Sequence, residues 1–219
     1  MSNDSINRLI VSGPAKDVES FAKAATDPRI LKRQLEKPSK RGPQCGLSFN
    51  ALLSGLPASW TTRLDREVTE PWDLSPDRPV RLKGEMIERT YRFQLRHYDP
   101  DTLLTAVSKQ YPRLCFVLGW VDPNSDDQAS RFIHSGHSAL YRLGEKRKRV
   151  LRARVPEEGT ADESEIFWAL IEADWAMMDA VVAHWDKRVT SVLSRVARAA
   201  AKSRGGTKGS RRRPSEAHE

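Results

Sequence analysis

Apolar and polar residues alternate most clearly over residues 89–97. Tyr91, Phe93 and Leu95 alternate there with Arg92, Gln94 and Arg96. A period of two predicts a half-buried strand with Arg92 and Arg96 on its outer face. The segment 114–121 is apolar at successive positions and predicts a central strand. Shorter apolar runs predict two further strands, over residues 6–12 and 47–53.

Helical spacing follows the first and third predicted strands. Apolar residues recur every three or four positions over residues 14–26 and again from Leu103 to Tyr111. Pro14 and Pro100 stand at the starts of these segments, where the missing N–H of proline does no harm to a helix. The sequence therefore predicts two helices, each placed between strands.

A hairpin is expected after the central strand, from residues 131–143 and 149–155, with a basic tip over residues 145–149. The resulting order is β-α-β-β-α-β plus a hairpin. This order is typical of an α+β fold, the ferredoxin-like split βαβ sheet, in which helices cover one face and the other face can stay open. Residues 54–88 are rich in proline and are expected to form an irregular insertion.

One long amphipathic helix is predicted over residues 160–204. Positions seven apart are apolar for five repeats, counted from Trp168 and again from Ile171. Thr160 or Asp162 would cap its start, because each precedes a glutamate by three residues.

Two roles for this helix remain open. It either covers the sheet of its own chain or pairs with a partner, another copy or another protein. The partner-helix seam would then be Trp185, Val189, Val192 and Val196. Acidic residues in its first half and basic residues in its second half favour an antiparallel pair if the partner is a second copy. The predicted organisation is thus a sheet domain over 1–156, the long helix, and a basic disordered tail over 205–219.

The distribution of charge favours nucleic acid as a partner, either DNA or RNA. The net charge is +8, and residues 202–219 carry half of it. Phosphate contacts need only positive charge and reach. Candidate binding residues lie on the third-strand face, the hairpin tip and the tail: Arg92, Arg96, Lys146, Arg147, Lys148, Arg149, Arg152, Lys202, Arg204, Lys208, Arg211, Arg212 and Arg213. Base stacking by Tyr91 and Phe93 is the less favoured alternative, because aromatic residues in such a stripe are usually buried.

Residue patterns for catalysis or metal binding are weak. His134 and His137 are the closest pair of potential metal ligands, and on one strand they would face opposite sides unless Gly136 bends the chain. Cys45 and Cys115 have no neighbouring base in sequence and are expected to be reduced and structural. No phosphate-binding glycine loop or serine-nucleophile motif occurs. We therefore expect no enzymatic activity, no cofactor and no metal.

No apolar run reaches the length that spans a bilayer, and the N-terminus lacks the pattern of a secretory signal. We therefore expect no membrane partner and a cytoplasmic location.

Three segments resemble the YubB ferredoxin-like domain family, which occurs on plasmids and in phages. They are residues 7–13 (NRLIVSG), 47–52 (LSFNAL) and 111–118 (YPRLCFVL). The resemblance implies a ferredoxin-like fold and a mobile-element context for an uncharacterised accessory protein. It does not imply an iron–sulfur cluster, because two cysteines cannot supply four thiolates.

Overall fold

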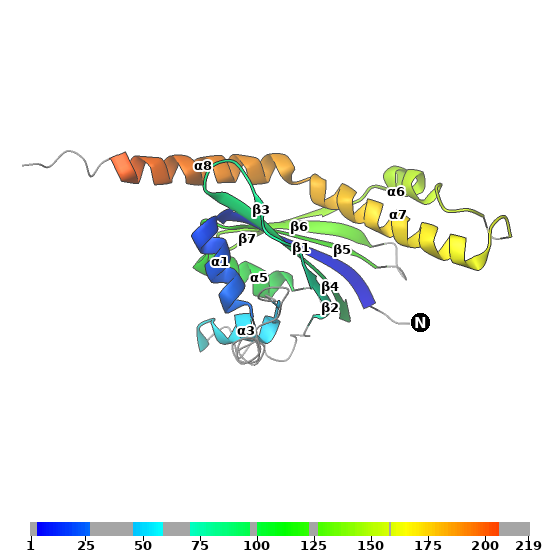
Figure 1. Ribbon diagram of the computed structural model, residues 1–219, viewed down its shortest axis with the longest axis horizontal. Coiled ribbons are helices and arrows are strands. Elements are labelled where there is room, and N and C mark those ends of the chain that lie inside the picture. Colours follow the sequence, from blue (N-terminus) through cyan, green and yellow to red (C-terminus); the bar gives the residue numbers. More distant parts are fainter. Residues whose placement is uncertain are drawn as a thin grey trace, which may run out of the picture.

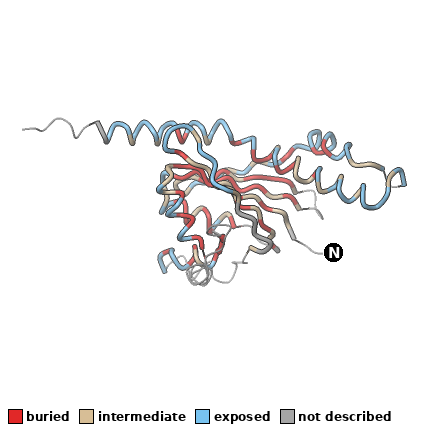
Figure 2. The backbone as a smooth tube through the Cα atoms, viewed as in Figure 1, coloured by how far each residue is buried: buried red, intermediate tan, exposed pale blue. Residues whose placement is uncertain are grey.

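The computed structural model describes residues 4–26, 46–58, 71–96, 100–122, 127–157 and 159–205. These residues form an α+β fold in three layers, with helices on both faces of one antiparallel sheet (Figure 1). Figure 2 shows that burial is concentrated in the sheet and in the helix surfaces that face it.

The sheet has the strand order β2-β4-β1-β5-β6-β7, and β3 pairs with β4. Its strands are β1 (Asp4–Pro14), β2 (Trp72–Pro76), β3 (Val80–Arg81), β4 (Met86–Arg96), β5 (Cys115–Val121), β6 (Gln128–His134) and β7 (His137–Arg142). The two longest strands, β1 and β4, lie next to each other, with Leu9 opposite Tyr91. Leu9 also lies opposite Leu118 of β5, so these three strands form the centre of the sheet.

Helices α1 (Ala15–Ala24), α3 (Phe49–Ser54) and α5 (Asp101–Gln110) cover the first face. The alternating side chains of β4 point into this layer, where Tyr91, Phe93 and Leu95 are buried. Phe21 of α1 meets the rings of Tyr91 and Phe116 edge to face, with centroid distances of 6.4 and 5.3 Å. The prediction of a half-buried third strand with buried aromatic residues is confirmed.

Helices α6 (Glu145–Arg152), α7 (Glu163–Ala183) and α8 (Asp186–Gly205) lie on the second face. Four residues of α7 (Met177, Met178, Val181 and Val182) form a second core with Val117 and Val121 of β5 and Phe132 of β6. This face, which the predicted order could leave open, is therefore covered over β5 and β6, as in the intramolecular alternative for the C-terminal helix. Asp162 caps α7 by accepting a hydrogen bond from the N–H of Glu165 at 2.8 Å, as the spacing predicted.

The predicted long helix is present as two helices, with a break at His184 and Trp185. The N–H of Trp185 donates to the carbonyl of Val182 at 3.1 Å, a three-residue step instead of the four-residue step of an α-helix. The carbonyl of Val181 instead accepts from the Ser130 hydroxyl at 2.6 Å, which in turn accepts from Trp185 Nε1 at 2.8 Å. Buried Ser130 therefore satisfies polar groups at the break and fixes it to β6.

The strand predicted over residues 47–53 is wrong. Residues 47–53 contain helix α3, because the Ser48 side chain accepts from the N–H of Ala51 at 3.1 Å and caps a helix. The second strand of the sheet is instead β2, which lies in the predicted irregular insertion together with β3.

The predicted hairpin is also displaced. It joins β6 to β7 through Ser135 and Gly136, whose positive φ angles of 49° and 81° suit a two-residue turn. Residues 149–155, assigned to its second strand, include the end of α6 instead. Leu151 lies three positions after Lys148, and both are buried on the inner side of this helix.

Gly119 of β5 allows α7 to approach the sheet closely. A Cβ atom there would lie 2.7 Å from Met178 Sδ and 2.8 Å from Val182 Cγ2. Both distances are too short for a side chain at this position, so Met178 and Val182 of α7 would have to shift.

We predict that Gly119→Val lowers the free energy of unfolding by about 1–3 kcal/mol, because it overpacks the contact between α7 and β5. Urea denaturation followed by circular dichroism measures this change. Gly144→Ser is the matched control, since a Cβ at Gly144 has no neighbour within 4 Å and this glycine caps α6. Equal stability of the two variants would show that the close approach is not a constraint.

Candidate nucleic-acid interface

Helix α6 holds five basic residues in eight positions. Its sequence favours a helix in this location, because Glu145 lies in the first turn and Arg149 and Arg152 lie in the last turn, where they complement the helix dipole. Leu151 anchors the helix in the core under α7. The predicted basic tip of a hairpin is thus a short helix fixed to the sheet.

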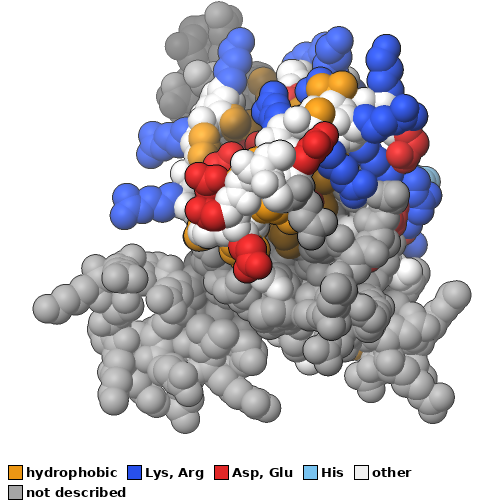
Figure 3. All heavy atoms as spheres, turned by 90° about the vertical axis from the view of Figure 1, so that its right-hand side faces the viewer, with side chains coloured by type: hydrophobic (Ala, Val, Ile, Leu, Met, Phe, Trp, Pro, Cys, Tyr) orange, Lys and Arg blue, Asp and Glu red, His pale blue; other side chains and the backbone are white. Residues whose placement is uncertain are grey.

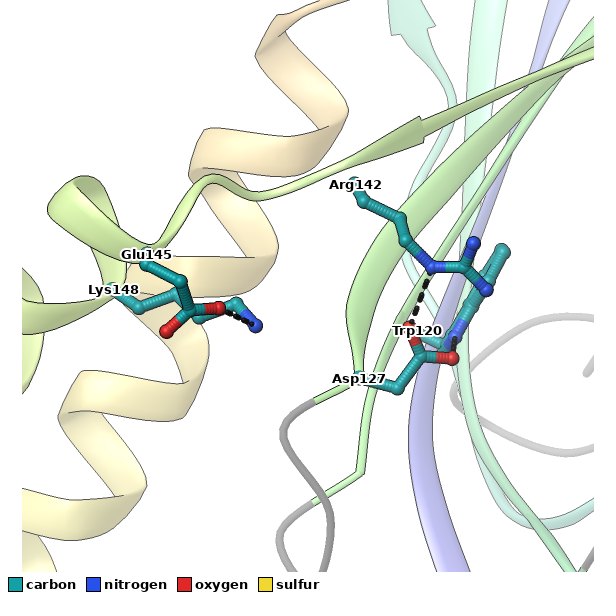
Figure 4. A network of polar contacts seen from close by, with 5 residues as sticks. All are labelled: Trp120, Asp127, Arg142, Glu145 and Lys148. Carbon is teal, nitrogen blue, oxygen red and sulfur yellow. Dashed lines mark hydrogen bonds and ion pairs between the residues drawn. The ribbon is translucent and has the colours of Figure 1, made fainter.

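Lys148 is the one predicted contact on α6 that points inward. It is buried, and its Nζ lies 2.8 Å from the carboxylate of Glu145 (Figure 4). Figure 4 also shows Asp127, which accepts from Trp120 Nε1 and from Arg142 Nε, both at 3.1 Å. The charge of Lys148 is therefore paired within the protein, and Lys148 is not available as a phosphate contact. The Arg142 side chain remains 62% exposed beside its ion pair with Asp127.

Three cations of α6 remain on its solvent side. Lys146, Arg147 and Arg149 are exposed, and none of them has an ion-pair partner in the part of the chain that the structure describes. Arg152 is exposed too, but it lies near Asp174 of α7. Burial raises the pKa of the Asp174 carboxyl, and the positive charge of Arg152 opposes that shift. The strongest candidates on this helix are therefore Lys146, Arg147 and Arg149.

Arg92 lies on the second face of the sheet, beside α7. Its guanidinium pairs with Asp77 at 3.0 Å and lies 5.8 Å from the ring centroid of Trp175. Arg8 of β1 approaches the same ring and pairs with Asp179. These interactions hold Arg92 within the fold, so it is a weaker candidate than its sequence position indicated. Arg96 ends β4, and its side chain lies outside the described residues.

The remaining predicted contacts belong to α8 and the tail. Lys202 is exposed near the end of α8, and Arg204 lies in its last turn. Lys208, Arg211, Arg212 and Arg213 lie outside the described residues. Helix α8 ends at the opposite end of the molecule from α6 (Figure 1). The structure thus separates the predicted cations into two groups, one on α6 and one toward the end of α8.

Base stacking by Tyr91 and Phe93 is excluded by their position, since both rings are buried under the first helix layer. Sequence reasoning missed the aromatic residues that are exposed. Phe167 and Trp168 of α7 leave 56% and 60% of their surfaces accessible. The heptad pattern identified Trp168 as a seam position but gave no signal of where the sheet beneath the helix ends.

The predicted partner-helix seam is used within the chain. Trp185 and Val192 are buried in the second core, and Val189 and Val196 pack against it. The intramolecular alternative for this stretch of the helix therefore agrees with the structure, in which Trp185 and Val192 are buried and Val189 and Val196 are partly buried.

No cluster in the described part of the chain combines three or more potential metal ligands. His134 and His137 lie opposite each other at the end of the β6–β7 hairpin, so the turn at Gly136 does bring them to one side. However, the Nδ1 atom of His134 is engaged with the carbonyl of Leu114 at 3.0 Å. None of the described helices has the length and apolar character needed to cross a bilayer.

Comparisons of the chain with protein-family models, curated proteins and solved structures give no significant match. The assignment of a function therefore depends on the geometry of these surfaces.

Burial raises the pKa of the Cys115 thiol to about 12, and the nearby Arg195 only partly opposes this effect. The thiolate is the reactive form, so native Cys115 has almost none at pH 8. We expect iodoacetamide to leave a Cys45→Ser chain unmodified at pH 8 and to add one adduct in urea, as read by intact mass. Rapid modification of the folded chain would show that the second core is open at β5.

Proposed function

We propose that this protein binds nucleic acid without sequence preference and without enzymatic activity, through the solvent side of α6 and the end of α8. The observation that carries the proposal is the arrangement of Lys146, Arg147 and Arg149. They project from a helix that is anchored by Leu151, and they lack internal ion-pair partners among the described residues. Anchored cations lose less conformational freedom on binding phosphate than cations on a free chain.

Helix α8 offers a second positive surface. It contains six basic residues and one aspartate, whereas α7 contains five acidic residues and no Lys or Arg. Figure 3 looks at the end of the molecule near α6, where Lys and Arg side chains gather along the upper part of the view. A long polyanion could contact α6 and α8 together with the tail, but it would be repelled by the acidic surface of α7 between them.

Phosphate contacts of this kind do not distinguish bases, and α6 presents no aromatic residue for stacking. The proposal therefore covers DNA and RNA alike. Binding would be driven by the release of counterions from the nucleic acid, which makes affinity strongly dependent on salt.

The sheet topology bears on the fold family and on the biological setting of the protein. The order β2-β4-β1-β5, with α1 and α5 on one face, has the arrangement of the split βαβ unit, to which β6 and β7 add a hairpin. We infer a ferredoxin-like fold on this basis. With the resemblance to the YubB family, it supports an accessory role for this protein in a plasmid or a phage.

The alternative function, protein interaction through the C-terminal helices, keeps one specific observation in its favour. The start of α7 exposes large apolar side chains, although the predicted seam further along is buried at Trp185 and Val192 and partly buried at Val189 and Val196. This surface is distinct from the α6 cations and is treated separately below.

The proposal predicts that Lys146→Ala with Arg149→Ala weakens binding to a labelled duplex at about 50 mM salt and lowers the slope of log affinity against log salt. Each lost phosphate contact reduces that slope by roughly 0.9. Fluorescence anisotropy at several salt concentrations measures both quantities, with single-stranded DNA and RNA as further probes. A chain that ends at Ala201 reports the combined contribution of the tail and of Lys202 and Arg204 at the end of α8.

Lys16→Ala with Lys23→Ala is the matched control. These two lysines are exposed on α1, on the other face of the sheet, and their removal lowers the net charge equally. Equal losses of affinity in the two variants would show that only the net charge matters, and would contradict a site on α6. Absence of binding by the complete chain at low salt would contradict the proposed function altogether.

A further inference from the structure

The first turns of α7 form an uncovered apolar patch. Phe167, Trp168 and Leu170 are 56%, 60% and 49% exposed, whereas Met177 and Met178, further along the same helix, are buried. The patch is built on ordered backbone, because Asp162 caps the helix and the rings of Phe167 and Trp168 meet edge to face at 5.5 Å. Three large apolar side chains within four positions are more than the scattered exposure that is normal on a protein surface.

Acidic residues surround this patch. Glu163, Glu165 and Glu172 are exposed on the same turns of α7. Apolar and acidic side chains lie side by side toward the middle of the end view in Figure 3. This combination disfavours nucleic acid and anionic lipid as ligands, because both would be repelled by the carboxylates. It favours a partner surface that is both basic and apolar.

The chain carries such a surface at the end of α8. Beyond Leu193 the helix exposes a set of basic residues (Arg195, Arg198 and Lys202). Ala199 lies on the same side of the helix, four positions after Arg195 and three before Lys202, and its small side chain leaves room for an aromatic ring. This surface complements the start of α7 in charge, and at Ala199 also in side-chain size.

The two surfaces lie at opposite ends of the molecule (Figure 1), so the start of α7 cannot contact the end of α8 within one copy. We propose that two copies of this chain associate antiparallel, with the start of α7 of each copy on the end of α8 of the other. A two-fold axis near the break at Trp185 forms both contacts at once and closes the assembly as a dimer. The interface uses the uncovered ends of the helical layer and leaves the buried seam on its own sheet.

This proposal does not rest on nucleic-acid binding, although both associations use the end of α8. It is therefore tested without nucleic acid, by sedimentation equilibrium over a range of protein concentrations. We expect a dimer mass for the complete chain and a monomer mass for Trp168→Glu. Val150→Glu is the matched control, because Val150 is 52% exposed on α6 and outside the patch. Circular dichroism confirms that both variants keep the fold, as expected for exposed positions.

A charge exchange tests the pairing itself. One variant carries Lys at Glu163, Glu165 and Glu172, and a second carries Glu at Arg195, Arg198 and Lys202. We expect each variant alone to be a monomer, because its two surfaces then have like charge, and an equimolar mixture to form heterodimers. A monomer mass for the unaltered chain at every concentration, or an undisturbed dimer in Trp168→Glu, would overturn the proposal. Sedimentation of the monomeric chain with zwitterionic lipid vesicles, lost in Trp168→Glu, would overturn it in favour of a membrane partner.

Discussion

The close packing of α7 over β5 decides which parts of the C-terminal helices face solvent. Gly119 lets Met178 and Val182 reach the sheet, and Ser130 fixes the helix break to β6. Burial of these apolar side chains on the second face is the dominant favourable term in their packing. The middle of α7 and the first half of α8 pack on the sheet in this way. The start of α7 and the end of α8 therefore remain free for other contacts.

This arrangement places helices of opposite charge side by side, and their charges decide which ligand each can bind. Helices α6 and α8 are basic and α7 is acidic, and all three lie on the same face of the sheet. The positive helices offer surfaces for phosphate, whereas the acidic start of α7 repels it. The same layer can therefore bind nucleic acid through α6 and α8 and a second copy through α7 and α8, with the end of α8 common to both. If both associations occur, the charges at this shared end limit how they combine.

Residue periodicity predicted the parts of the fold that depend on local burial. The alternation in β4, the apolar β5 and the capping of α7 by Asp162 were all predictable, because each leaves a repeating or short-range signal. The identity of residues 47–53 was not, since a short apolar run fits either a strand or a helix and the Ser48 cap decides it. The basic residues of α6 were identified, but the inward orientation of Lys148 depends on tertiary packing. The exposure of Trp168 could not be predicted either, because a heptad pattern does not show where the sheet beneath the helix ends.

Amide hydrogen exchange tests the packing of α7 and α8 on the sheet most directly. It is measured at a protein concentration low enough to keep the chain monomeric. Slow exchange over residues 173–193 with faster exchange at the start of α7 and the end of α8 is the expected result, because only the middle is held against the sheet. Fast exchange over residues 173–193 would contradict it, since the helices would then be detached and their seam available to a partner.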